Sequence, residues 1–120
     1  MTFLQDGIND MFISYTYFPL ILDYRPIDTN LTTSLTDKSV VVNTSFDVTC
    51  SSQANPPAKY RFYKDQQNFV NDTTGGDISV ITTSIDKRVK QVNYGCTPFN
   101  DFGDGSTEVI TVTVLCKYSV

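Results

Sequence analysis

The sequence contains no histidine among its 120 residues. It therefore lacks the side chain that most often serves as a general base, proton shuttle or metal ligand near neutral pH. It also has no Ser-x-x-Lys or Gly-x-Ser-x-Gly pattern for a serine nucleophile, and no glycine pattern that would cradle nucleotide phosphates. We therefore predict that the protein is not an enzyme and binds no cofactor.

Charged residues are also scarce, at 18% of the chain, and the net charge is −4. This balance argues against nucleic acid and anionic membranes as partners, because both are bound through basic surfaces. The run Lys87, Arg88 and Lys90 is the local exception. It fits a site for sulfated glycans or an acidic partner, but such runs are more often solvated loops.

The chain has no long apolar run. Residues 1–10 carry two acidic residues and no basic one, and Pro19 and several polar groups interrupt the apolar stretch 12–22. Neither stretch matches a signal peptide or a membrane span. We therefore expect the chain to be a segment of a longer protein.

Threonine, valine and aromatic residues are plentiful, which favours strands over helices and predicts an all-β class. Three segments alternate in the manner of half-buried strands. Their inward residues are Phe46, Val48 and Cys50 in the first, Tyr60 and Phe62 in the second, and Tyr94 and Cys96 in the third. Two cysteines and an aromatic ring would thus face one core.

With these residues in place, 27–115 resembles an immunoglobulin-superfamily domain of the I-set or C2-like type that occurs in adhesion and receptor ectodomains. The family pattern has cysteine on strand B, an aromatic residue on strand C and Tyr-x-Cys on strand F. It is filled by Cys50, Phe62, Tyr94 and Cys96. The positions of Asn100 and Gly103 after the second cysteine, and Asn55-Pro56-Pro57 before strand C, are also similar to the family.

Two positions depart from the family pattern. Phe62 stands where the family has tryptophan, and Lys90 stands where many members have an aspartate, which puts the usual salt bridge under the E to F turn in doubt. The resemblance implies a two-sheet antiparallel sandwich. It also implies a tyrosine corner, in which the Tyr94 hydroxyl bonds to backbone in that turn.

The resemblance further implies a disulfide between Cys50 and Cys96, which would stabilise the fold by roughly 4 kcal/mol by closing a long loop. Such a bond persists in an oxidising compartment. Two buried free thiols in a cytosolic sandwich are the alternative. Cys116 is left over: it could pair with another chain, pair with a cysteine beyond this segment, or be a small apolar residue near a domain junction.

Three glycosylation sequons begin at Asn30, Asn43 and Asn71. All three fall where the strand assignment places exposed edges or turns. Together with the implied disulfide, they predict an extracellular or cell-surface location reached through the secretory pathway.

The predicted organisation is an extension or the end of a preceding domain with its linker at 1–26, the immunoglobulin-like domain at 27–115, and a tail or linker at 116–120. Within the domain we expect strands at 27–36, 39–42, 44–52, 59–64, 68–70, 78–85 and 106–115, with strand F following the turn at 86–89. A further β-rich stretch at 15–24 should end at Pro26. Residues 20–26 resemble residues 112–118, which suggests a tandem array of immunoglobulin-like domains. The alternative is that the two β-rich segments are unrelated.

The resemblance implies a recognition module for a protein or glycan partner, with homophilic binding as one option. A structural spacer in a tandem array is the alternative function. The predicted binding residues are Arg61, Tyr63 and Phe99, on the outer face of the sheet formed by strands C, F and G, where Thr97 should also point outward. We interpret 101–105 as a hairpin tip, because it lacks the oxygen spacing of a calcium loop, and we predict no metal site.

Overall fold

The computed structural model describes residues 22–115. The strands and the one 3-10 turn are, in chain order, β2 (Tyr24–Thr33), η1 (Thr36–Lys38), β3 (Ser39–Val41), β4 (Phe46–Asn55), β5 (Lys59–Lys64), β6 (Gln67–Asp72), β7 (Ile78–Thr83), β8 (Gln91–Asn100), β9 (Gly103–Asp104) and β10 (Glu108–Leu115). Cys116, the predicted 116–120 tail and most of the predicted stretches 1–26 and 15–24 lie outside the described residues.

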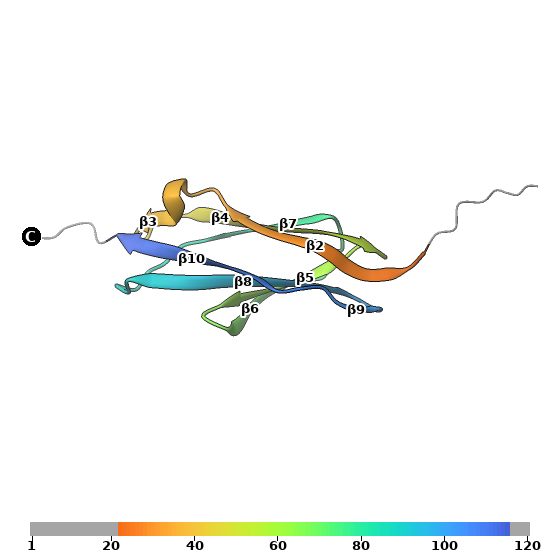
Figure 1. Cartoon of the computed structure of the whole chain (residues 1–120). Coiled ribbons are helices and arrows are strands. Elements are labelled where there is room, and N and C mark those ends of the chain that lie inside the picture. The colour runs from red at the N-terminus through yellow and green to blue at the C-terminus, as the bar shows by residue number, and fades with distance from the viewer. Residues whose placement is uncertain (1–21, 116–120) are drawn as a thin grey trace, which may run out of the picture.

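The strands form two stacked sheets (Figure 1). One sheet has the order β2-β4-β7. The other has the order β3-β10-β8-β5-β6, and β9 pairs with β8. The prediction of an all-β, immunoglobulin-like sandwich is confirmed, and β5, β8 and β10 are its strands C, F and G.

One pair of strands is parallel, which the sequence did not predict. β3 runs parallel to β10, with Val40 opposite Val114, whereas the other pairs among the described strands are antiparallel. After β2 the chain crosses through η1 from the first sheet to the second without reversing direction. Asp37 and Lys38 make this crossing with positive φ angles.

The first strand begins at Tyr24 and passes through Pro26, so the prediction that it starts at residue 27 was wrong. Pro26 is tolerated because β2 is an edge strand whose register with β4 shifts on both sides of Ile27. β4 runs on to Asn55, into the predicted loop 53–58, because Tyr24 pairs with Asn55 and Ile27 with Gln53.

A disulfide between Cys50 on β4 and Cys96 on β8 joins the two sheets, with a Cα–Cα distance of 6.4 Å. Phe62 lies directly opposite Cys96 on the neighbouring strand. All three side chains have no exposed area. The Phe62 ring thus occupies the family's tryptophan position without needing the hydrogen-bond partner that an indole N–H requires.

The predicted tyrosine corner is wrong. Tyr94 is fully buried and its ring packs edge-on against Phe46 at 5.7 Å, but its hydroxyl has no hydrogen-bond partner among residues 22–115. The carbonyls around the β7–β8 turn accept other bonds. Ile85 O accepts from Asn43 N, and Lys90 O accepts from Val114 N. Burial raises the pKa of Tyr94, although the nearby Thr83 side chain acts in the opposite direction.

Replacing Tyr94 by phenylalanine should therefore leave the free energy of unfolding unchanged or raise it by up to about 1 kcal/mol, because a buried hydroxyl without a partner costs desolvation. Urea unfolding measures this change. The matched control is Tyr60→Phe, since the Tyr60 hydroxyl donates to Gly76 O at 2.9 Å and lies 3.1 Å from Ser52 Oγ. That variant should lose about 1 to 2 kcal/mol. If both variants lost the same free energy of unfolding, the Tyr94 hydroxyl would have a hydrogen-bond partner and the tyrosine corner would exist.

Asp72 ties the edge of one sheet to the other. Its carboxylate accepts hydrogen bonds from the backbone N–H and hydroxyl of Thr74 and from the buried Ser79 hydroxyl on β7. These bonds, the one from Ser79 above all, hold the pKa of Asp72 below its ordinary 3.8. The ionised carboxylate therefore stabilises the fold.

A lowered carboxyl pKa contributes stability that is complete above the unfolded pKa and is lost as the pH falls through the folded pKa. Asp72→Ala should accordingly unfold at a lower temperature than the parent near neutral pH. The difference between the two should shrink as the pH falls below 3.8 and the carboxyl protonates. Thermal unfolding of both proteins across this range checks the prediction, and a difference that does not depend on pH would contradict it.

Candidate functional site

The outer face of the β10-β8-β5 strands carries the predicted binding residues. Arg61 and Phe99 are brought together there: the guanidinium lies 3.9 Å from the centre of the Phe99 ring. Arg61 Nη1 also lies 3.2 Å from Asp104 Oδ2, beside the hairpin tip. Because its side chain is one third exposed, the Arg61 guanidinium forms a partly solvated stack that keeps donors available for a partner.

Tyr63 lies further along β5, opposite Gly95 on β8. On the other side of Gly95 lies Val109 of β10, whose side chain is 58% exposed. Since Gly95 has no side chain, Tyr63 and Val109 flank a hollow of about 110 Å³. We call it the Gly95 hollow; its lining residues are Tyr63, Gln66, Asn93, Gly95, Thr107 and Val109.

Thr97 lies on this face, opposite Arg61, but it is only 5% exposed. Its hydroxyl is hydrogen-bonded to the hydroxyl of Thr107, and Arg61 is its cross-strand neighbour. Thr97 therefore supports the face from beneath its exposed side chains.

Sequence reasoning missed Gly95, Asp104 and Val109. A signal existed for Val109, because Ile110, Val112 and Val114 alternate inward along β10 and leave it as an apolar residue on the outward face. Gly95 and Asp104 carried no comparable signal, since a glycine in a strand and an aspartate in a hairpin tip are both commonplace.

The 101–105 segment forms a hairpin tip, as predicted: residues 101–102 make the turn between β8 and β9, and Gly103–Asp104 is β9 itself. Asn100 holds this end of the domain together: its amide donates to Tyr24 O at 2.8 Å and to Pro56 O at 3.0 Å, and its oxygen accepts from Phe102 N. The Asp104 carboxylate forms an ion pair with Arg61. Within residues 22–115, no three acidic or cysteine side chains are grouped so that they could hold a metal ion.

All three sequon asparagines are exposed. Asn30 lies on β2 and Asn43 lies in the turn between β3 and β4. Asn71 lies on edge strand β6, where it pairs with Arg61. A glycan on Asn71 would therefore border the Arg61 end of the binding face, while the Gly95 hollow lies on the other side of β5.

Lys87, Arg88 and Lys90 are exposed in the connection between β7 and β8, where the sequence predicts a turn. The part of the chain that the structure describes contains no helix of the length and hydropathy needed to cross a membrane.

Comparison with known protein families gives one match. The family model described as "Immunoglobulin domain" matches residues 28–114, which is most of the chain. A search of curated protein sequences with this chain found no match.

Several solved structures are similar in fold. Titin M4 aligns with a TM-score of 0.59 and 16% identity, over 79% of this chain and 100% of that one. The ectodomain (Ig1-Ig3) of mouse nectin-like molecule 4 aligns with a TM-score of 0.57 and 19% identity, over 82% of this chain and 33% of that one. The PKD domain of an M14-like peptidase from a Thermoplasmatales archaeon aligns with a TM-score of 0.53 and 14% identity, over 78% of this chain and 98% of that one. At these identities the likeness concerns the fold alone.

Proposed function

The chain belongs to the immunoglobulin domain family, and from this membership we propose that it is a non-catalytic recognition domain that binds a protein partner on the outer face of β5, β8 and β10. The observation that carries the proposal is the Gly95 hollow, an apolar recess between Tyr63 and Val109. A recess flanked by a tyrosine on an otherwise flat sheet suits a single apolar side chain of a partner.

The surroundings of the Gly95 hollow suit a protein interface. Tyrosine and arginine are enriched among residues that dominate binding energies, because each combines a large contact area with a polar group. Here Tyr63 borders the hollow, and Arg61, stacked on Phe99, lies two residues before Tyr63 on β5. The arrangement of an apolar centre with a polar, partly solvated rim is that of specific protein interfaces.

An extracellular location is part of the proposal. The Cys50–Cys96 disulfide needs an oxidising compartment to persist, and the three sequon asparagines are exposed as glycosylation requires. In such a setting the partner would be a cell-surface or secreted protein, or a second copy of the domain.

A spacer in a tandem array is the second candidate, and one observation favours it. β2 begins at one end of the sandwich and β10 ends at the opposite end (Figure 1). Domains with ends so placed can be joined in line by short linkers. A spacer needs no binding face, so the two functions are separated by a binding experiment.

The experiment uses the full chain secreted from a glycosylating host and presented as a tetramer. It is screened against a panel of purified ectodomains that includes the chain itself, and the affinities of variants are then measured for each binder. Tyr63→Ala, Phe99→Ala and Gly95→Ala should each weaken binding by roughly fivefold to tenfold or more, about 1 kcal/mol or above. Gly95→Ala is the sharpest of these, because its new methyl group would occupy part of the Gly95 hollow at ordinary contact distances of 3.5 to 3.6 Å from its neighbours.

The matched control is Val80→Ala, which removes an apolar side chain that is 53% exposed on the strand β7 of the other sheet. It should bind as the parent does. Full binding by a folded Tyr63→Ala/Phe99→Ala double variant would contradict this face as the binding site and indicate that the partner binds at a loop tip. An absence of any binder in the panel would favour the spacer.

A further inference from the structure

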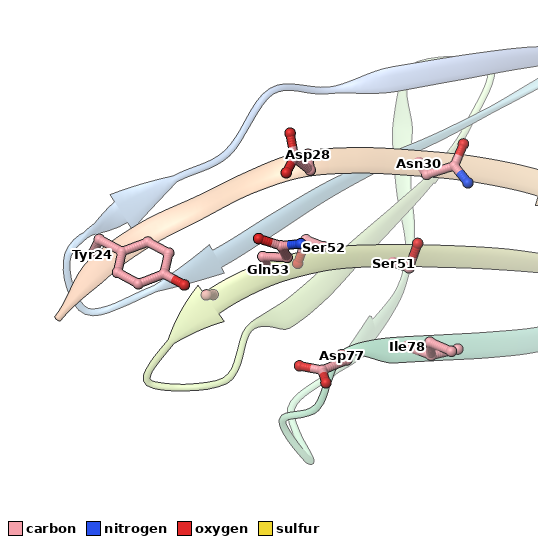
Figure 2. A pocket seen from close by; sticks show the side chains of 9 residues that line it. Tyr24, Asp28, Asn30, Ser51, Ser52, Gln53, Asp77 and Ile78 are labelled. Atoms are coloured by element: carbon pink, nitrogen blue, oxygen red, sulfur yellow. The ribbon is translucent and has the colours of Figure 1, made fainter. Parts of the chain in front are cut away.

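A second, larger hollow of about 530 Å³ lies on the β2-β4-β7 sheet, on the opposite side of the sandwich from the Gly95 hollow. It exists because the register between β2 and β4 shifts twice between Tyr24 and Asn30, with Asp28 at a φ of +58°. These irregularities bend β2 away from a regular ladder and leave the side chains of β4 uncovered. We call it the Asn30 hollow (Figure 2).

One residue that lines the Asn30 hollow is itself an acceptor for modification. Asn30 begins the sequon Asn30-Leu31-Thr32 and is exposed. Strand register sets Asn30 beside Ser51 on β4, and Ser51 beside Ile78 on β7, so the three form one row across the sheet. A sugar attached to the Asn30 amide therefore starts at the rim of the hollow.

We propose that an N-linked glycan on Asn30 folds back into the Asn30 hollow and packs along it toward Tyr24. The hollow follows β2 and β4 for the length of strand between these two residues, roughly 15 to 20 Å, which is more than one sugar ring requires. Figure 2 shows the Asn30 amide at one end, the Tyr24 ring at the other, and polar side chains between them.

The lining has the chemistry that a sugar chain needs. The apolar faces of sugar rings pack on exposed hydrophobic groups. Here these are Ile78, 62% exposed and beyond Ser51 in the row that starts at Asn30, and the Tyr24 ring, 40% exposed at the far end. Sugar hydroxyls and acetamido N–H groups need acceptors and donors, which the side chains between those two ends supply. These are Asp28, Ser51, Gln53 and Asp77.

The covalent link decides which sugar occupies the hollow. A ligand tethered next to its site has an effective concentration in the millimolar range, so contacts too weak to hold a free saccharide are still occupied. The lining residues Asn30, Gln53, Asp77 and Ile78 are exposed, which suits such weak, extended contacts. A glycan held in this way would shield the exposed Ile78 and stiffen the bulged end of β2.

This inference rests on the secretory route in the proposed function, and it is tested without the binding assay. The full chain is secreted from a glycosylating host, and glycopeptide mass spectrometry measures occupancy at Asn30. Thr32→Ala removes this sequon and keeps Asn30, whereas Thr73→Ala, the control, removes the Asn71 sequon on the other sheet. Heteronuclear NMR of tyrosine-labelled protein follows the Tyr24 ring, and thermal unfolding follows stability.

We expect Asn30 to be occupied. Thr32→Ala should shift the Tyr24 ring signals and lower the unfolding temperature by about 4 °C, and Thr73→Ala should leave the Tyr24 signals unchanged. In a Tyr24→Ala background, loss of the Asn30 glycan should lower the unfolding temperature by less than it does in the parent. Ile78→Ser replaces Tyr24→Ala in this comparison if the Tyr24 variant folds poorly.

Three results would overturn the proposal. One is an unoccupied Asn30 in the secreted protein. Another is an occupied Asn30 whose removal changes the Tyr24 signals no more than Thr73→Ala does. The third is binding of free chitobiose by the Thr32→Ala protein at low millimolar concentration, which would assign the hollow to a saccharide from another molecule. The proposed function stands or falls on the Gly95 hollow variants and is unaffected by these outcomes.

Discussion

Replacing Cys50 and Cys96 together by alanine is expected to lower the free energy of unfolding by about 4 kcal/mol. The bond joins residues 46 positions apart, so breaking it restores to the unfolded chain the entropy that closing this loop removes. Both cysteines are fully buried between the sheets, and Phe62 lies opposite Cys96 on the neighbouring strand. A change of this size is a large share of the ~5 to 15 kcal/mol that stabilises an ordinary domain.

Urea unfolding of the parent and the double variant measures the difference. Cys116→Ser is the control and should unfold like the parent, because the internal bond uses the other two cysteines. Peptide mapping that linked Cys116 to Cys50 or Cys96 would contradict the pairing. A double variant within about 1 kcal/mol of the parent would show that the loop is already restricted in the unfolded chain.

The second large effect is expected at Gly105, which follows β9. A Cβ atom there would lie 2.9 Å from Pro26 O and 2.9 Å from Pro98 Cγ, closer than such atoms approach in proteins. The neighbours cannot yield easily, because one is backbone of β2 and the other a fully buried proline ring of β8. Gly105→Ala should therefore lower the free energy of unfolding by about 2 to 3 kcal/mol.

Gly76→Ala is the matched control for this substitution. A Cβ at Gly76 would meet nothing closer than Ile78 O at 3.8 Å, and its φ lies outside the left-handed region. Gly76→Ala should leave stability unchanged or raise it by up to about 1 kcal/mol, since alanine restricts the unfolded chain. Thermal unfolding of the two variants measures the difference. Equal midpoints would mean that Pro26 and Pro98 can move away from a Cβ atom at residue 105.

Much of the fold could be predicted from the sequence because strand alternation and the family pattern depend on local spacing. The inward phase of Phe46, Val48 and Cys50 on β4 is correct, and the bounds of β5 agree with the prediction. The immunoglobulin-like class was implied by the family resemblance of Cys50, Phe62, Tyr94 and Cys96, which lie on β4 of one sheet and on β5 and β8 of the other and share one core. A period of two residues is short enough to be read directly from the chain.

The candidate site was predicted only in part. The outward direction of Arg61, Tyr63 and Phe99 followed from the same alternation, and Arg61 and Phe99 do meet. The Gly95 hollow did not follow, because it is formed by residues of three strands whose relative register depends on turns and bulges. The burial of Thr97 under Thr107 escaped prediction for the same reason.

The sequence by itself determined the class of fold, the core and the face to which each side chain of a regular strand points, because these depend on the alternation of neighbouring residues. Only the tertiary structure decided which side chains of different strands are neighbours. It left the Tyr94 hydroxyl without a partner, set Asn71 beside Arg61, and placed Asn30 at the rim of a hollow. Each of these depends on the register between strands that are distant in the chain, and a local pattern carries no record of that register.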